Sequence, residues 1–76
     1  MTAELDSVVL TRDLPDHGLK AGDIGTVVFV YPSGSEFEVE FVTAGGGTVA
    51  VLPLSVGEVR PMLPNEIHHV RAVSSG

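Results

Sequence analysis

The segment Glu36–Val42, with the sequence EFEVEFV, constrains the fold more than any other part of the chain. Glutamates at positions 36, 38 and 40 alternate with Phe37, Val39 and Phe41. Successive side chains of a β-strand point to opposite faces of a sheet, so this order produces one apolar face and one charged face. The segment therefore predicts a strand that is buried on one side and exposed to water on the other.

Glycine and proline divide the rest of the chain into further short segments. Valine is abundant, and β-branched side chains favour strands. We expect strands over Leu5–Arg12, Ile24–Tyr31, Thr48–Leu54 and Val59–Pro61. We also expect a long loop over Asp13–Asp23, a hairpin tip at Gly45–Gly47 and a 3₁₀ turn over Ser55–Glu58. Because Pro53 cannot donate a backbone hydrogen bond, its strand should end there or lie at a sheet edge.

This layout predicts an all-β protein, namely an SH3-like small barrel of about five antiparallel strands. We expect the barrel domain to span residues 1–61 and a short C-terminal tail to span residues 62–76. A flat sheet of this length would leave one apolar face in water, whereas a curled sheet buries that face. The expected core consists of Val8, Leu10, Ile24, Phe37, Val39, Phe41, Val49 and Val51.

The second strand has apolar side chains on both faces, with Val28 and Val30 on one and Val27 and Phe29 on the other. A β-bulge near Val27–Val28 would change the alternation, and tightly curved barrels often need such a bulge. Either the strand is buried on both sides or such a bulge is present, and we favour the bulge, which leaves Phe29 exposed.

The tail, Met62–Gly76, has two possible conformations. Pro64 could begin a short helix that carries Ile67 and Val70 on one side, or the segment could form an extended arm. A helix this short is marginal in water on its own, so the tail must pack on the barrel, pack on a partner or remain loose. We expect Ser74–Gly76 to be disordered.

Several of these residues carry a resemblance to a known family. The segments that carry it are Asp13-Leu14-Pro15, Gly18–Val28, Glu38–Val42, Thr48–Val51 and Val59–Pro61. Over roughly residues 4–61 the chain resembles the DUF4926 family of small bacterial proteins, and the resemblance implies no particular function. The element Gly22-Asp23-x-Gly25-x-Val27 is also similar to the loop and strand that open KOW modules, although any barrel of this kind needs such a corner.

The charge and the residue inventory argue against several classes of function. A net charge of −6 is a poor match for nucleic acid, because binding to phosphates requires a basic face. The chain has no cysteine, which excludes a disulfide scaffold, a thiolate zinc site and a thiol nucleophile. No apolar run approaches the ~20 residues of a membrane span, so we expect a cytoplasmic protein without a membrane partner.

The candidate catalytic and metal-binding groups favour no enzyme and no cofactor. Same-face glutamates two residues apart lie about 7 Å from one another, too far to grip one small ion, so the glutamates should keep the strand soluble. His17, His68 and His69 are expected to be surface residues. The serines lack the G-x-S-x-G motif, the glycine run lacks a following helix, and no tryptophan is present to line a groove for proline-rich peptides.

These observations favour a non-catalytic, acidic interaction module that binds another protein as a monomer or weak homodimer. The expected contact residues are Phe29, Tyr31, Asp16, His17, Leu19 and Lys20. An antitoxin- or immunity-like role beside a basic toxin would fit the charge. The alternative is a nucleic-acid-associated barrel of KOW type, which would need a basic cluster, and a third option is an accessory subunit of an enzyme.

Overall fold

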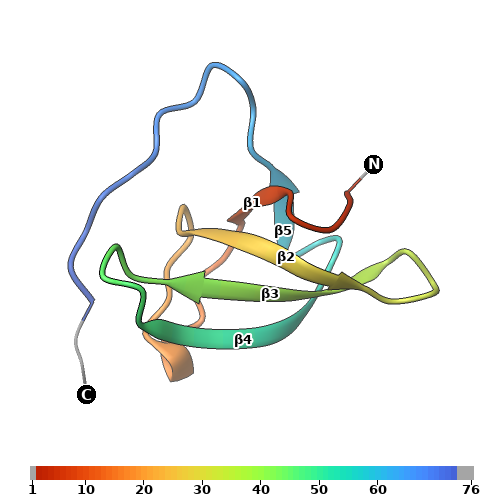
Figure 1. Ribbon diagram of the computed structural model, residues 1–76, viewed down its shortest axis with the longest axis horizontal. Helices are drawn as coiled ribbons and strands as arrows, with labels where there is room; N and C mark the ends of the chain where they lie inside the picture. The colour runs from red at the N-terminus through yellow and green to blue at the C-terminus, as the bar shows by residue number, and fades with distance from the viewer. Residues whose placement is uncertain (1, 74–76) are drawn as a thin grey trace.

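The computed structural model describes residues 2–73, and its regular structure is almost entirely β-strand (Figure 1). The strands are β1 (Ser7–Leu10), β2 (Ile24–Val30), β3 (Glu36–Val42), β4 (Thr48–Ser55) and β5 (Val59–Pro61). They form one antiparallel sheet in the order β4-β3-β2-β1-β5. The predicted all-β class is confirmed. Since β4 and β5 are not neighbours in this order, the sheet is open and is compatible with an SH3-like barrel.

The predicted bulge in the second strand is present. The register of β2 against β3 shifts between Val27 and Phe29. Val27 is fully buried, whereas Val28 and Phe29 are 39% and 45% exposed. The extra residue changes the alternation, so two neighbouring apolar side chains lie on the outer face of the sheet.

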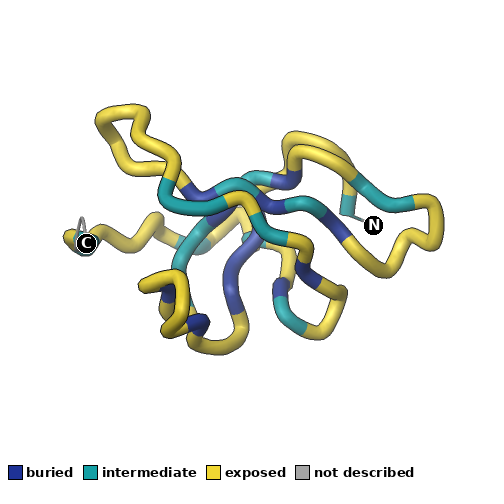
Figure 2. The backbone as a smooth tube through the Cα atoms, turned by 90° about the horizontal axis from the view of Figure 1, so that it is seen from below, coloured by how far each residue is buried: buried dark blue, intermediate teal, exposed yellow. Residues whose placement is uncertain are grey.

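The core lies on the inner face of the bent sheet, and Figure 2 shows these buried stretches surrounded by exposed loops. Among the described residues no polar or charged side chain is buried. The stability of the sheet therefore comes from apolar burial and backbone pairing. The core residues are Val8, Leu10, Leu14, Leu19, Val27, Phe37, Val39, Phe41, Leu54 and Val59.

The structure differs from the prediction in which side chains of β4 face the core. Val51 is 47% exposed, and Val49 is only partly buried. Cross-strand partners share a face of the sheet, and the partners of the buried β3 residues are Ala50, Leu52 and Leu54. Val51 lies opposite Glu40 instead, on the outer face. Ile24, the other misplaced member of the expected core, is half-buried.

The first loop is more ordered than its glycines suggested. It contains the 3₁₀ helix η1 (Pro15–His17), which ends at Gly18 with a φ of 69°. Leu14 and Leu19 flank η1 and are joined by two backbone hydrogen bonds of 2.8 and 3.1 Å. Both leucines belong to the core, so the loop closes one end of the sheet.

The 3₁₀ turn expected before the last strand is a simpler turn. Residues 56–58 form a hydrogen-bonded turn, in which the Glu58 amide donates to the Ser55 carbonyl at 2.9 Å. Within the described residues, the 3₁₀ helix lies instead in the first loop, as η1. Pro15 favours it there, because the fixed φ of proline suits the first position of a helix.

The tail contains no helix between residues 62 and 73, which favours the extended arm. It leaves β5, arches away from the sheet and descends beside the opposite end (Figure 1). Val9, on the outer face of β1, is only 7% exposed and lines a pocket of about 200 Å³ together with Met62 and Ile67 of the tail. Residues 74–76, expected to be disordered, lie outside the described residues, and the domain boundary at residue 61 stays a prediction.

Candidate functional site

The predicted contact residues separate into two surfaces. The first loop leads into β2 at one end, while Phe29 and Tyr31 lie at the other end. A strand rises about 3.3 Å per residue, so the ends of this strand are roughly 20 Å apart. Asp16, His17 and Lys20 are exposed on the loop, whereas Leu19 is 3% exposed and belongs to the core. Leu19 is therefore not available to a partner, because its side chain closes the end of the sheet.

The first surface, called here the aromatic face, is the outer side of β2, β3 and β4. The rings of Phe29 and Tyr31 meet edge to face, with centroids 5.1 Å apart and planes at 87°. The Tyr31 hydroxyl donates a hydrogen bond to the Glu38 carboxylate. Opposite Glu38 on β4 lies Pro53. The members of the aromatic face are Val28, Phe29, Tyr31, Glu36, Glu38, Glu40, Val51 and Pro53.

Carboxylates and aromatic rings are in direct contact on this face. The hydrogen bond to Glu38 raises the pKa of Tyr31 above its usual value, because loss of the hydroxyl proton would place two negative charges side by side. Aromatic rings attract cations over their faces, and carboxylates form strong hydrogen bonds with guanidinium and ammonium groups. The aromatic face can therefore accept a side chain that combines an apolar stem with a cationic head.

The adjacent edge of the sheet, β4, is poorly suited to pairing with another strand. The Val56 amide donates to the Ser35 carbonyl at 3.1 Å, which sets the alternation of hydrogen bonds between β3 and β4. Every second residue of β4 then points its backbone N–H and C=O groups away from β3, toward the open edge of the sheet. These residues are Val51, Pro53 and Ser55. Pro53 has no N–H, and the Ser55 amide donates to the Glu58 carboxylate at 3.0 Å. The β4 edge is therefore a poor site for the addition of a further strand.

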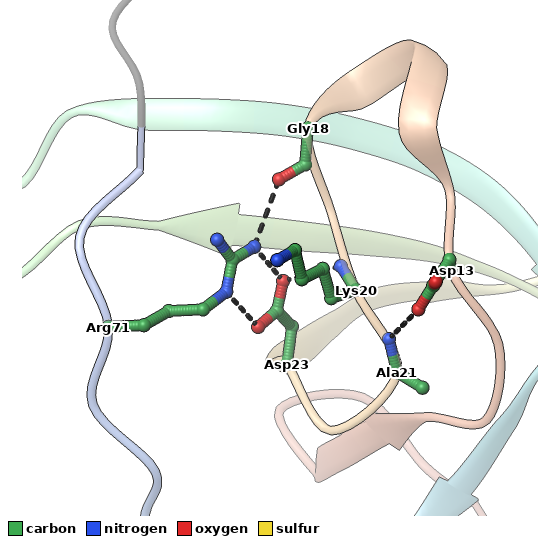
Figure 3. Close-up of polar contacts among 6 residues, drawn as sticks. All are labelled: Asp13, Gly18, Lys20, Ala21, Asp23 and Arg71. Carbon is green, nitrogen blue, oxygen red and sulfur yellow. Dashed lines mark hydrogen bonds and ion pairs between the residues drawn. The ribbon is translucent and has the colours of Figure 1, made fainter.

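The second surface lies at the first loop, where Arg71 of the tail contacts Asp23 (Figure 3). The Arg71 Nε and Nη2 atoms donate to the two Asp23 carboxylate oxygens at 2.8 and 2.5 Å. Nη2 also donates to the Gly18 carbonyl at 2.9 Å. The two side chains are only 23% and 13% exposed. The guanidinium holds the pKa of Asp23 below its usual value, although partial burial opposes this shift.

The loop holds these acceptors in place through its own contacts. The Lys20 amide donates to the Asp23 carboxylate at 2.9 Å, and the Asp23 amide donates to the Lys20 carbonyl at 3.0 Å. Gly22 has a φ of 96°, which glycine adopts readily in a tight turn. Across the loop, the Ala21 amide donates to the Asp13 carboxylate at 2.9 Å. The Asp23 carboxylate is thus held from within the loop by the Lys20 amide as well as by Arg71 of the tail.

A second arginine–carboxylate pair holds the beginning of the tail. Arg60 of β5 donates to both oxygens of Glu66, at 2.8 and 2.6 Å. The Leu63 amide also donates to Glu66, at 2.6 Å. These bonds lower the pKa of Glu66 to about 2, the pair with Arg60 having the larger effect. The described part of the tail is therefore attached by ion pairs at Glu66 and at Arg71.

Neither ion pair was predicted, because the partners have no periodic relation in the sequence. Asp23 and Arg71 are 48 positions apart. The three histidines are exposed. Within residues 2–73, no cluster of three or more His, Asp or Glu side chains has the geometry to hold a metal ion, and no helix is long and apolar enough to cross a membrane.

Comparison with known proteins gives one match. No curated protein and no solved structure is similar enough to match the chain. A family model, described as a domain of unknown function, matches residues 4–61, which include all five strands and the first loop. This match covers well over half of the chain and confirms the resemblance found in its sequence. The chain belongs to the DUF4926 family.

Proposed function

We propose that this protein is a non-catalytic interaction module that binds a basic protein through its aromatic face. The observation that supports this proposal most directly is Phe29, which is 45% exposed and packs against Tyr31 beside a row of glutamates. A large aromatic side chain left in water is costly, and aromatic residues dominate the binding energy of many interfaces. The bulge of β2 places Phe29 there.

The charge of the protein supports a basic partner. A net charge of −6 on a chain this small accelerates encounter with basic proteins and slows encounter with phosphate backbones. Encounter by itself does not form a lasting complex, and the aromatic pair supplies the apolar contact. A cytoplasmic, antitoxin- or immunity-like protein that covers a basic protein is the role that fits these features best.

The test compares three baits in a pull-down from the native host: the unaltered protein, Phe29→Ala and Val56→Ala. Val56 is 56% exposed in the turn before β5 and is not a member of the aromatic face, so it serves as an apolar control. We expect a basic protein to be captured by the unaltered bait and by Val56→Ala but not by Phe29→Ala. Equal capture by all three baits would contradict the proposal.

A second measurement addresses nucleic acid. The protein is titrated against labelled single- and double-stranded oligonucleotides at two salt concentrations. We expect no binding at physiological salt. Micromolar affinity that falls steeply with salt would replace the protein-binding proposal with the KOW-like one, because steep salt dependence marks the release of phosphate counterions.

A further inference from the structure

The first loop forms a binding site for a guanidinium group, and in this structure the occupant is Arg71 of the same chain (Figure 3). Three acceptor atoms converge on the group: both carboxylate oxygens of Asp23 and the carbonyl oxygen of Gly18. A planar guanidinium offers its N–H groups in a fixed fork that matches such a set, whereas an ammonium does not. The acceptors are oriented by the loop, so the site persists when the tail leaves it.

The apolar side chains of the arch that leads to this site are largely exposed. Ile67 and Val70, which lie on the arch between the two ion pairs, are 91% and 88% exposed. Removal of residues 67–71 from the loop would therefore expose little apolar surface of the segment itself, and the pocket against Val9 is lined by Met62 as well as by Ile67. A segment held mainly by one ion pair opens more easily than a packed element, because few buried contacts oppose the opening.

We infer that the Asp23 site is a receptor for an arginine side chain of the protein partner, and that Arg71 occupies it until the partner displaces the tail. This inference rests on the proposed function for the basic character of the partner. With Arg71 removed, the loop carries the three carboxylates of Asp13, Asp16 and Asp23 against the single ammonium of Lys20. The emptied site is therefore negative and favours a cation.

A pocket beside the site accommodates more than the guanidinium. It has a volume of about 430 Å³ and is bounded by Asp13, Pro15 and Lys20 of the loop and by Arg71 and Ala72 of the tail. The tail forms one wall, so its displacement widens the pocket. The apolar stem of the incoming arginine then has a surface to pack on at Pro15, as arginine stems commonly do.

The tail tethers Arg71 to the site, and this tether determines how strongly Arg71 competes with an arginine of the partner. An arginine on a short flexible tether competes at an effective concentration on the order of millimolar. A free arginine derivative therefore displaces Arg71 poorly, whereas a partner that also contacts the aromatic face has enough additional binding energy to do so. The tail would in this way exclude weak, single-arginine ligands.

The test empties the site and refills it with a small probe. The full-length variant Arg71→Ala is titrated with N-acetyl-arginine amide, and the amide NMR signals of residues 18–23 are followed. We expect saturable binding with a dissociation constant on the order of millimolar, and at least tenfold weaker binding of N-acetyl-lysine amide, because only the guanidinium matches the acceptors. The unaltered protein should bind the arginine probe about twofold more weakly than Arg71→Ala, because an effective concentration and a dissociation constant that are both on the order of millimolar leave Arg71 in the site about half of the time.

Two further variants serve as controls. Arg60→Ala breaks the other ion pair and leaves Arg71 in place, so it should behave like the unaltered protein. Arg71→Ala combined with Asp23→Asn should lose the binding, because the carboxylate is gone. Failure of Arg71→Ala to show saturable binding, or equal binding of the arginine and lysine probes, would overturn the inference.

The same assay separates this inference from the proposed function. The double variant Phe29→Ala/Arg71→Ala should retain probe binding, since Phe29 lies at the far end of β2. Probe binding without any Phe29-dependent protein partner would refute the proposed function and leave the guanidinium site standing. Phe29-dependent capture without probe binding would support the proposed function and overturn the guanidinium site.

Discussion

In the five-stranded sheet the buried side chains of the described residues are all apolar, whereas in the tail the contacts are made mainly by charged side chains. There Ile67 and Val70 are about nine-tenths exposed, and the contacts are made by Arg60 with Glu66 and by Arg71 with Asp23. The sheet is a folding unit because burial of apolar area is cooperative and insensitive to charge. The tail is an attached segment, and its attachment depends on the ionisation of two carboxylates.

This difference predicts that the two regions respond to different perturbations. Loss of core volume should unfold the sheet and carry the tail with it. Loss of charge should release the tail and leave the sheet folded. The following changes test the comparison, from the largest expected effect to the smallest.

The largest effect is expected from Phe41→Ala. Phe41 is 3% exposed and lies on the inner face of β3, so its loss leaves a cavity and should cost about 3–5 kcal/mol. A domain of this size has a total stability of roughly 5 kcal/mol, so most of it would be lost. Urea denaturation measures the change. An unchanged midpoint would mean that the core does not hold the sheet together.

Gly25→Ala should destabilise the sheet by about 1–3 kcal/mol, because it adds volume to a filled core. A Cβ atom at Gly25 would lie 2.5 Å from Val39 Cγ1 and 2.8 Å from Phe41 Cε1. Gly57 is the matched control, since a Cβ atom there would meet nothing within 4 Å. Equal urea midpoints for Gly25→Ala and Gly57→Ala would show that β2 and β3 do not approach one another so closely.

Acid should release the tail before it disturbs the sheet. The folded-state pKa values of Asp23 and Glu66 lie below their ordinary values of 3.8 and 4.5, that of Glu66 at about 2. The contribution of each pair is therefore complete above the ordinary value and is lost as the pH falls through the lowered one. In an NMR titration, the amide signals of residues 66–73 should change below about pH 4, while the methyl signals of the buried Val39 on β3 do not.

The variant Arg71→Gln provides the comparison for that titration. The amide signals of residues 69–73 should match those of the released tail already at neutral pH, while the pair of Arg60 with Glu66 still holds the beginning of the tail. The urea midpoint of this variant should equal that of the unaltered protein. A single transition shared by the tail and β3 would show that the two regions form one cooperative unit, and the distinction between them would then fail.

The smallest effect on stability is expected from Glu38→Ala on the outer face of β3. The unfolding free energy should stay within about ±0.5 kcal/mol, as for most surface substitutions. The pKa of Tyr31 should fall toward its ordinary value, because the hydrogen bond from its hydroxyl to Glu38 is lost. The chain has one tyrosine and no tryptophan, so absorbance titration follows this group alone. A stability loss as large as that of Phe41→Ala would mean that the faces of β3 are misassigned.

The features that the sequence determined by itself are those with a local pattern. The alternation in β3 specifies which side chains are buried, because strand side chains alternate whatever the neighbouring strand is. The two apolar sides of β2 favoured a bulge, and the bulge explains the exposure of Phe29. The last strand, Val59–Pro61, was predicted with its observed bounds for the same reason, since turn residues enclose it.

Other features were decided only by the tertiary structure. The sequence of β4 is apolar on both sides, so only its register against β3 could show that Leu52 faces the core and Val51 does not. Leu14 and Leu19 became core residues because the first loop folds over the end of the sheet. The pairing of Arg71 with Asp23 has no signal in the sequence, because a long charged side chain needs no periodicity. Such a pair forms only after the strands have brought the two distant segments together.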